Sequence, residues 1–415
     1  MRRITACRVC GGGELATVLA LGEVPLANAL LAPGDADLPE PRFPLTLAFC
    51  PSCSLVQILE TVDPEELFRH YLYFSSFSET MLRHAREEAE TLAARESLGA
   101  RSLVVEIASN DGYLLRNFVE RGIPVLGVEP ARNIAAVAEG RGVATLAEFF
   151  GAAVARRLAA EGRHADVVIA NNVLAHVADL HGVAEGIATV LKPGGVAAIE
   201  FPWLGTMIEA LEFDTIYHEH LCYFSLHAIT ALFDRHGLVV EDVERHAIHG
   251  GSLRVYLRPG GAARPRPSVG ALLDEERRRG MTTLAYYADF ARRVRALGEA
   301  LTGELRRRKS AGQRLAAYGA SAKGSTLMSA FGIGGDLLDF VADRSTVKQG
   351  RLTPGNRLPI VPAEALVERR PDATLLLTWN FADEIFRQQR AYLEAGGVFV
   401  VPVPEVRVVG KEVLA

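Results

Sequence analysis

Short hydrophobic runs alternate with turns and helical stretches through the middle of the chain. The run at residues 102–108 is built mainly of Leu, Val and Ile, as buried parallel strands are. Similar runs lie at residues 123–128, 166–170 and 196–200, and a helical pattern starts at Tyr113. This alternation predicts a doubly wound α/β fold, in which ligands bind at the carboxyl ends of the strands.

Helical patterns flank the predicted sheet on both sides. Before it, residues 79–95 carry apolar side chains on one face, from Met81 to Leu92. After it, residues 264–310 contain runs of charge that predict helices with solvated faces, joining two lobes. The remainder predicts a third α/β unit, with strands at residues 314–318, 338–342 and 373–378 and a helix at 325–331.

Composition limits the class of protein. The 415 residues, 49% hydrophobic and 23% charged, suffice for several folded cores. The net charge is -5, whereas nucleic-acid binders usually carry an excess of basic residues, so we expect no nucleic-acid partner. No apolar run is long enough to span a membrane, so we expect no membrane partner either. The predicted parts are an N-terminal domain at 1–75, the middle sheet domain at 76–262, a helical linker at 263–312 and a C-terminal α/β domain at 313–415.

Four of the five cysteines form two separated Cys-x-x-Cys pairs, Cys7 with Cys10 and Cys50 with Cys53. A secreted disulfide framework would use more cysteines, and no signal-like apolar stretch precedes the first one, so we expect a cytosolic protein with reduced thiols. Four thiolates at this spacing can close tetrahedrally on one Zn²⁺, and an all-sulfur site is structural. Buried thiols or a redox pair are the alternative.

The ends of the first two predicted strands suit a nucleoside cofactor. Glu106 precedes a turn, and about twenty residues later the next strand ends at Glu129, whose carboxylate can accept hydrogen bonds from two ribose hydroxyls. A dinucleotide site requires several glycines, whereas Gly112 is the only glycine of this turn. Asn110 and Asp111 would be unfavourable beside a pyrophosphate and favourable beside a sulfonium, which predicts S-adenosylmethionine.

Two further groups are predicted at the same edge of the sheet. Glu148, Phe149 and Phe150 close a short predicted strand and could frame an adenine, although core packing is the alternative for the phenylalanines. Asn171 and Asn172 end the strand at residues 166–170 and face the same ligand. Together these groups favour a methyltransferase over a dehydrogenase.

Several motifs, in order along the chain, resemble those of one known family. They are the cysteine pairs, Ser109-Asn-Asp-Gly-Tyr, Tyr217-His-Glu-His, His249-Gly-Gly and Tyr318-Gly-Ala-Ser-Ala-Lys. Over nearly its whole length the chain resembles the zinc-containing sugar C-methyltransferases, which methylate a ring carbon of nucleotide-linked keto-deoxysugars. The resemblance implies structural zinc in the first domain, S-adenosylmethionine in a Rossmann-like methyltransferase domain, and a Rossmann-like last domain that helps to hold the nucleotide sugar.

Forming a carbon–carbon bond beside a ketone requires a base that removes a proton, and a positioned base accelerates such a step by about 10²- to 10⁴-fold. Residues 217–220 offer candidates. In an extended chain Tyr217 and Glu219 would face one way and His218 and His220 the other, whereas an irregular loop would let them converge. The two histidines could instead ligate a metal together with His249 or a carboxylate.

The resemblance assigns roles to five residues. By it, His220 matches the base with Tyr217 and Glu219 beside it, and Tyr73 and His176 match further active-site positions. The chemistry agrees, because histidine titrates near neutral pH and a neighbouring carboxylate can fix its tautomer. Packing is the alternative for Tyr73 and for His176.

In the C-terminal domain, Ser321 and Lys323 open a predicted helix. Backbone amides there, with the lysine, could hold the diphosphate of a nucleotide sugar, and a purely structural turn is the alternative. Arg344 follows the next strand and could help to bind the diphosphate; the alternative is that it is a solvated surface residue.

The predicted function is S-adenosylmethionine-dependent C-methylation of a nucleotide-linked keto-deoxysugar through an enolate, by a monomer or small homo-oligomer. An NAD-dependent sugar oxidoreductase and a non-catalytic zinc scaffold that binds sugar nucleotides are the alternatives.

Overall fold

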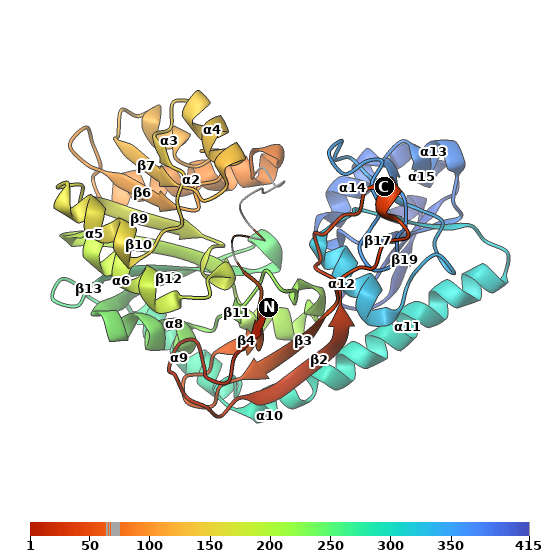
Figure 1. The fold of residues 1–415 in the computed structure, drawn as a ribbon, viewed down its shortest axis with the longest axis horizontal. Coiled ribbons are helices and arrows are strands. Elements are labelled where there is room, and N and C mark those ends of the chain that lie inside the picture. The colour runs from red at the N-terminus through yellow and green to blue at the C-terminus, as the bar shows by residue number, and fades with distance from the viewer. Residues whose placement is uncertain (64, 66, 68–74, 415) are drawn as a thin grey trace.

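The computed structural model describes residues 1–63, 65, 67 and 75–414 (Figure 1). Two α/β lobes stand apart, and the N-terminal strands lie between them (Figure 1). The long helix α11 (Phe290–Ser310) runs from these strands to the C-terminal lobe (Figure 1). Within the described residues, no helix is both long enough and apolar enough to cross a membrane.

The N-terminal region forms a four-stranded antiparallel sheet that is completed by a distant segment. Its strand order is β11-β4-β3-β2, and β11 (Cys222–Tyr223) comes from beyond residue 200. β1 (Arg2–Arg3) pairs separately with β5 (Glu60–Thr61). The other strands are β2 (Ala16–Val24), β3 (Phe43–Phe49) and β4 (Val56–Ile58).

The middle lobe contains a seven-stranded sheet of order β12-β13-β10-β9-β6-β7-β8. The predicted doubly wound arrangement is confirmed for its five parallel strands, and β13 and β12 extend it antiparallel beyond β10. Residues 192–195 lie inside β10 and interrupt its pairing with β9. The strands are β6 (Val104–Ile107), β7 (Val125–Val128), β8 (Thr145–Leu146), β9 (Ala165–Asn171), β10 (Leu191–Pro202), β12 (Leu238–His246) and β13 (Ser252–Pro259).

Helices cover both faces of this sheet, which is why its central strands are apolar on both sides. The predicted helix at 79–95 is confirmed as α2 (Glu79–Arg95), and the Ser78 hydroxyl caps it by accepting from the Met81 N–H. The next helix, predicted from Tyr113, begins only at Arg116 because a compact turn occupies the preceding residues. The remaining helices are α3 (Arg116–Val119), α4 (Arg132–Gly140), α5 (Ala152–Ala160), α6 (Leu180–Val190), α7 (Leu204–Glu209) and α8 (Leu226–Phe233).

The C-terminal lobe has a second doubly wound sheet, of order β16-β15-β14-β17-β18-β19, in which only β19 is antiparallel. The helices predicted between the lobes are present. The sheet consists of β14 (Leu315–Tyr318), β15 (Val341–Asp343), β16 (Ile360–Pro362), β17 (Ala373–Leu376), β18 (Val398–Val401) and β19 (Arg407–Val409), and the helices are α9 (Pro267–Arg278), α10 (Leu284–Ala288), α11, α12 (Ala322–Phe331), α13 (Ala365–Arg369), α14 (Ala382–Gln388) and α15 (Arg390–Glu394).

Candidate active site and zinc centre

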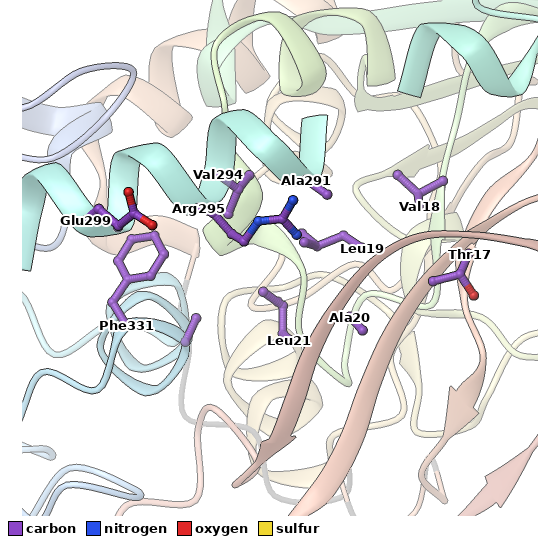
Figure 2. Close-up of a pocket in the computed structure, with 12 residues that line it drawn as sticks. Thr17, Val18, Leu19, Ala20, Leu21, Ala291, Val294, Arg295, Glu299 and Phe331 are labelled. Carbon is purple, nitrogen blue, oxygen red and sulfur yellow. The ribbon is translucent and has the colours of Figure 1, made fainter. Parts of the chain in front are cut away.

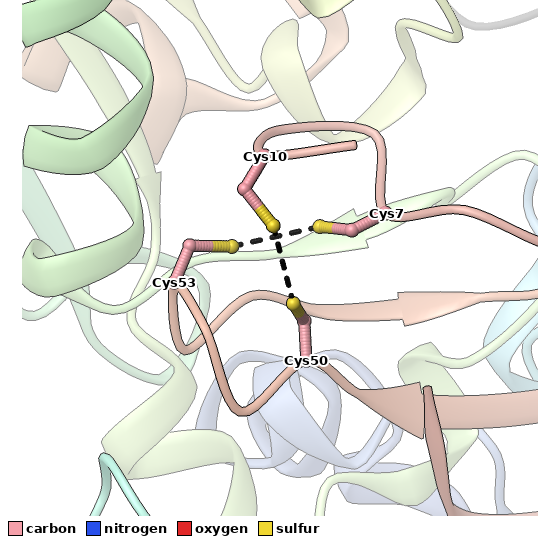
Figure 3. Close-up of side chains that lie close together, drawn as sticks. All are labelled: Cys7, Cys10, Cys50 and Cys53. Carbon is pink, nitrogen blue, oxygen red and sulfur yellow. Dashed lines mark hydrogen bonds between the residues drawn. The ribbon is translucent and has the colours of Figure 1, made fainter. Parts of the chain in front are cut away.

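The four paired cysteines converge on one point (Figure 3). The Sγ atoms of Cys7 and Cys53 are 3.5 Å apart, and those of Cys10 and Cys50 are 3.4 Å apart. A tetrahedral zinc–thiolate site with bonds of about 2.3 Å has sulfur–sulfur edges of about 3.8 Å. All four sulfurs lie within 4.8 Å of one another, so they fit a zinc ion that has no position for a substrate.

The zinc-bearing region is tied directly to residues 217–220, which we call the 217–220 segment. β11 follows this segment and pairs antiparallel with β4, and the Ile58 N–H donates to the Leu221 carbonyl at 3.0 Å. Asn28 Nδ2 donates to Glu219 Oε1 at 2.6 Å. The N-terminal region therefore positions the predicted catalytic residues as well as binding zinc.

The 217–220 segment is a turn, and it brings Tyr217 and His220 together. The Tyr217 hydroxyl lies 2.9 Å from His220 Nε2, and the ring centroids are 4.1 Å apart. His220 Nδ1 lies 2.8 Å from the Thr215 carbonyl oxygen. Because a carbonyl only accepts, we assign the ring proton to Nδ1, which leaves the Nε2 lone pair facing the Tyr217 hydroxyl. Thr215 is a participant that sequence reasoning missed, since a backbone carbonyl has no sequence signature.

His176 lies against the His220 ring and contacts the Glu219 backbone. The His176 and His220 ring centroids are 4.8 Å apart, and His176 Nδ1 is 2.7 Å from the Glu219 carbonyl oxygen. Burial lowers the pKa of His176 to about 4, which keeps it neutral at physiological pH. Burial raises the pKa of the Glu219 carboxyl to about 7, opposed by the hydrogen bond from Asn28. Tyr73, the remaining predicted member, lies outside the described residues.

His218 points away from this group. Its Nε2 lies 3.0 Å from the Pro44 carbonyl oxygen, and its ring meets Phe43 edge-on. His218 therefore contacts the N-terminal region, and the described geometry does not bring it to His220 as a pair of metal ligands. The expectation that Glu219 fixes the tautomer of His220 is also wrong, because the Thr215 carbonyl faces Nδ1.

Glu106 lies in β6 at the centre of the middle sheet and is 1% exposed. One of its carboxylate oxygens is buried with no hydrogen-bond partner among the described residues, as are the side-chain oxygens of Asn171 and Asn172 at the end of β9. Burial, reinforced by three neighbouring carboxyl groups, raises the pKa of Glu106 well above its usual range. These buried acceptors fit a cationic N–H donor, such as the ammonium of S-adenosylmethionine.

The turn after β6 has a conformation that few residues adopt. Ala108, Asn110 and Gly112 have φ values of 51°, 48° and 77°. A Cβ at Gly112 would lie 2.8 Å from a Val143 methyl, so this position requires glycine. Glu129 holds the turn from the next strand by accepting the Asn110 N–H at 3.0 Å and one further backbone N–H. Each of its oxygens retains a lone pair that a ribose hydroxyl can use.

Asp111 has an ion-pair partner that the sequence did not indicate. Its carboxylate is fully buried and accepts hydrogen bonds from Arg141 Nη1 at 2.7 Å and from the Ser76 hydroxyl. Arg141 and Ser76 contact Oδ2, whereas Oδ1 is buried with no hydrogen-bond partner among the described residues, so Asp111 stays a predicted cofactor residue. Arg141 lies thirty positions along the chain, so local sequence does not reveal the pair.

Glu148 and Phe150 also have other partners than the predicted ones. β8 ends at Leu146, before these residues, and Glu148 makes an exposed ion pair with Arg157 at 2.6 Å. Phe150 packs against the core, where its ring lies close to Gly186. This packing favours the core-packing alternative for Phe150. Phe149 lies half-buried between them.

A buried polar layer lies beside the strand ends, and sequence reasoning missed it. Asn171 Nδ2 donates to Glu88 Oε2 at 2.6 Å, and Arg254 Nη2 lies 3.1 Å from the same oxygen. Arg254 also pairs with Glu200 at 2.6 Å, and His84 lies 2.9 Å from Glu200. The available signal was Glu88, a glutamate at core-facing spacing within the apolar face of α2.

In the C-terminal lobe, the three residues predicted to bind substrate have different environments. The Ser321 hydroxyl caps α12 by accepting the Gly324 N–H at 3.0 Å. Lys323 Nζ lies 4.8 Å from the centroid of the Trp379 ring. Arg344 is 65% exposed and makes a loose ion pair with Glu384 at 3.8 Å. Lys323 therefore faces the interior of the molecule, whereas Arg344 belongs to the surface.

A cavity of about 520 Å³ lies where β2, α11 and α12 meet (Figure 2). Leu19, Val294 and Phe331 contribute apolar walls, and Arg295 and Glu299 contribute charge. None of the described residues predicted for the active site lines it. The cavity is therefore distinct from the site at the strand ends.

Comparison with known proteins assigns the chain to a family. Family models match a zinc binding domain at residues 7–68, a methyltransferase domain at 78–243 and a C-methyltransferase C-terminal domain at 247–404. The C-methyltransferase NovU of Streptomyces niveus is 39% identical over 417 residues, which cover 99% of this chain and 98% of the relative. The chain belongs to the zinc-containing C-methyltransferase family. S-adenosylmethionine is its cofactor, and the oxidoreductase and scaffold alternatives are set aside.

Solved methyltransferases resemble part of the chain. The amino pentose methyltransferase CalS10 of Micromonospora echinaspora is 19% identical, covers 46% of this chain and 99% of its own, and gives a TM-score of 0.34. Magnesium protoporphyrin IX methyltransferase ChlM of Synechocystis PCC 6803 is 14% identical, with coverages of 42% and 78% and a TM-score of 0.33. The family assignment depends on the full-length relative and the family models, and not on these partial likenesses.

Proposed function

We propose that this C-methyltransferase acts on a ring carbon beside the keto group of a nucleotide-linked keto-deoxysugar. The observation that carries the proposal is the His220 imidazole, whose Nε2 faces the Tyr217 hydroxyl while Nδ1 faces a carbonyl. A half-buried imidazole held in one tautomer is suited to remove a proton from carbon.

His220 is the proposed base. Its Nε2 takes the proton from the substrate carbon, and the electron pair of the broken C–H bond passes into the enolate. Bound S-adenosylmethionine supplies an electrophilic methyl group on its sulfonium. The Tyr217 hydroxyl lies within hydrogen-bond distance of Nε2. It can instead donate its hydrogen bond to the enolate oxygen.

His176 and Glu219 complete the proposed site. A neutral His176 beside His220 adds no positive charge that would oppose proton uptake by the base. With a pKa raised to about 7, Glu219 is protonated in part of the molecules at neutral pH and can then donate a hydrogen bond to the enolate oxygen. Tyr73 stays a proposed member of the site by resemblance.

The cofactor would be held at the edge of the middle sheet. We assign its ammonium to the buried acceptors of Glu106, Asn171 and Asn172, and its ribose to Glu129. The turn with Asn110 and Gly112 lies between these groups and would contact the cofactor through its backbone. Phe149 is retained as a candidate for the adenine.

Substrate recognition would fall to the C-terminal lobe. Lys323 stands at the start of α12, near the carboxyl end of β14, where a phosphate is favoured by the backbone amides and the ammonium. We also propose that the chain is divided into the four parts predicted from the sequence, at 1–75, 76–262, 263–312 and 313–415. A cytosolic location is part of the same proposal.

The decisive experiment is incubation with a labelled methyl donor and a panel of nucleotide-linked sugars with and without a keto group. We expect one added methyl on a ring carbon of a keto sugar, located by mass and NMR spectra. His220→Ala should lower turnover by about 10²- to 10⁴-fold and leave the affinity for S-adenosylhomocysteine unchanged. Near-normal turnover of His220→Ala, or methylation of sugars that lack a keto group, would contradict the proposal.

A further inference from the structure

The C-terminal lobe touches the middle lobe just before the 217–220 segment. The contact is the short helix η4 (Phe213–Thr215), whose Asp214 is fully buried. Trp379 Nε1, at the start of η7 (Trp379–Phe381), donates to Asp214 Oδ2 at 2.7 Å. Phe213 stacks against Phe331 of α12 with ring centroids 4.8 Å apart.

Charge from the C-terminal lobe reinforces this contact. Lys323 Nζ lies 4.8 Å from the Trp379 ring centroid. Burial raises the pKa of Asp214, while the ammonium of Lys323 and the Trp379 hydrogen bond act in the opposite direction. The Lys323 ammonium also acts to lower the pKa of Glu212, another buried acid. Lys323 therefore acts on two carboxyl groups of the middle lobe. The interlobe contact is thus a hydrogen bond to a buried carboxyl group with an ammonium nearby.

The residue after Asp214 is the one that orients His220. The Thr215 carbonyl accepts from His220 Nδ1 at 2.8 Å and from the Tyr223 hydroxyl at 3.3 Å. Since Asp214 and Thr215 share a peptide bond, a shift of η4 moves this carbonyl directly. The Thr215 hydroxyl, which donates to the Glu212 carbonyl, ties the same turn together.

We propose that Trp379 and Asp214 are positioning residues, and that the hydrogen bond between them holds the Thr215 carbonyl in line with His220 Nδ1. The C-terminal lobe thereby sets the tautomer of the base without contacting it. This inference rests on the proposed function, because it takes His220 as the base. Trp379 and Lys323 follow the carboxyl ends of β17 and β14, the edge at which such sheets bind ligands. A substrate bound at this edge would therefore lie near the hydrogen bond between Trp379 and Asp214 and could alter it.

The chain offers a matched control. Trp203 Nε1 donates to the buried Glu276 carboxylate at 2.8 Å, which is the same bond chemistry at another place. Trp379→Phe and Trp203→Phe each remove one indole N–H and retain an aromatic ring. Both should lower the melting temperature, and only Trp379→Phe should affect His220.

The primary readout is the nitrogen resonances of His220, assigned by their loss in His220→Ala. We expect the wild type to carry the proton on Nδ1, and Trp379→Phe to populate both tautomers. The acid limb of the kcat/KM profile should move down by about 0.5 to 1 pH unit, because an imidazolium that lacks its acceptor is less stable. His176, Tyr217 and Tyr223 contact the His220 ring, and Glu219 precedes it in the chain. Variants of these four residues would show whether the acid limb belongs to one of them.

Variants of Asp214 test the hydrogen bond with Trp379 from the acceptor side. In Asp214→Asn an amide oxygen still accepts from the indole, so the wild-type tautomer should persist, whereas Asp214→Leu should reproduce Trp379→Phe. A wild-type tautomer and acid limb in either folded variant, Trp379→Phe or Asp214→Leu, would overturn the inference. Normal turnover of His220→Ala would instead remove the proposed function, and the tautomer readout would still report on the interlobe bond.

Discussion

The two α/β lobes share an architecture and differ in what their strand ends offer. At the edge of the middle sheet, Glu106, Asn171 and Asn172 keep buried oxygens that find no donor in the part of the chain that the structure describes. At the same edge of the C-terminal sheet, Asp343 accepts backbone N–H groups on both oxygens, and the Ser321 hydroxyl caps a helix. The proposed function places a cation at the first edge, whereas Asp343 and Ser321 at the second edge bind backbone N–H groups of their own loops. Similar folds therefore do not imply similar binding sites.

Glu106→Gln should have the largest effect on this comparison. A charge removed from a buried pair weakens binding by a few kcal/mol, so we expect affinity for S-adenosylhomocysteine to fall about 100-fold by calorimetry. The ligand-free variant should melt at a higher temperature than the wild type, because ionising a buried carboxyl with a raised pKa opposes folding above its ordinary pKa. Unchanged affinity would remove Glu106 from the cofactor site.

Asp343→Asn is the counterpart in the C-terminal sheet. Both carboxylate oxygens accept N–H groups, from Ala320 at 2.6 Å and Ser345 at 2.7 Å, and an amide can accept only on one side. We expect a loss of about 2 kcal/mol in stability, measured by denaturant unfolding, with cofactor affinity unchanged. A variant that binds S-adenosylhomocysteine more weakly would show that the two edges are not independent.

Proton release is a finer test of Glu106. A cationic ligand favours the ionised carboxylate, so binding should lower the raised pKa of Glu106 and release protons. Affinity should therefore rise with pH until Glu106 is ionised in the free protein, and level off above that pH. Calorimetry in buffers of different ionisation enthalpy measures the release, which Glu106→Gln should abolish. Proton uptake on binding would contradict the assignment.

Ser321→Ala should have the smallest effect, and it separates two interpretations of the C-terminal turn. Loss of a helix cap costs about 1 kcal/mol, visible as a modest fall in melting temperature. If the hydroxyl only caps α12, KM for the nucleotide sugar should stay at the wild-type value. A several-fold rise in KM with unchanged kcat would assign Ser321 to the diphosphate.

Local patterns in the sequence were sufficient for much of the fold. α2 was predicted with its observed ends because its apolar face is regular. The cysteine pairs were interpretable because each knuckle is local and only their joining is long-range. The edge strands β16 and β19 were missed, since three residues carry too little periodicity to detect. The longer strands β12, β13 and β18 were also missed.

The site was predicted less well, because its decisive contacts join distant parts of the chain. Asp111 was interpreted without Arg141, and Lys323 without the Trp379 ring beside it. His220 and Tyr217 were identified, but the carbonyl that orients the imidazole could not be, as every residue has one. Residue identity predicts which groups take part in the chemistry, and tertiary contacts decide their protonation and orientation.

The pairing of β11 with β4 has a consequence for modularity. A fragment cut at the predicted boundary near residue 75 would leave Cys222 and Tyr223 with an unpaired backbone edge, next to the residues proposed for chemistry. Exchange of the N-terminal region between relatives would likewise replace one partner of an active-site strand. Engineering that treats the metal-binding region as a detachable module should therefore transfer both halves of this pairing together.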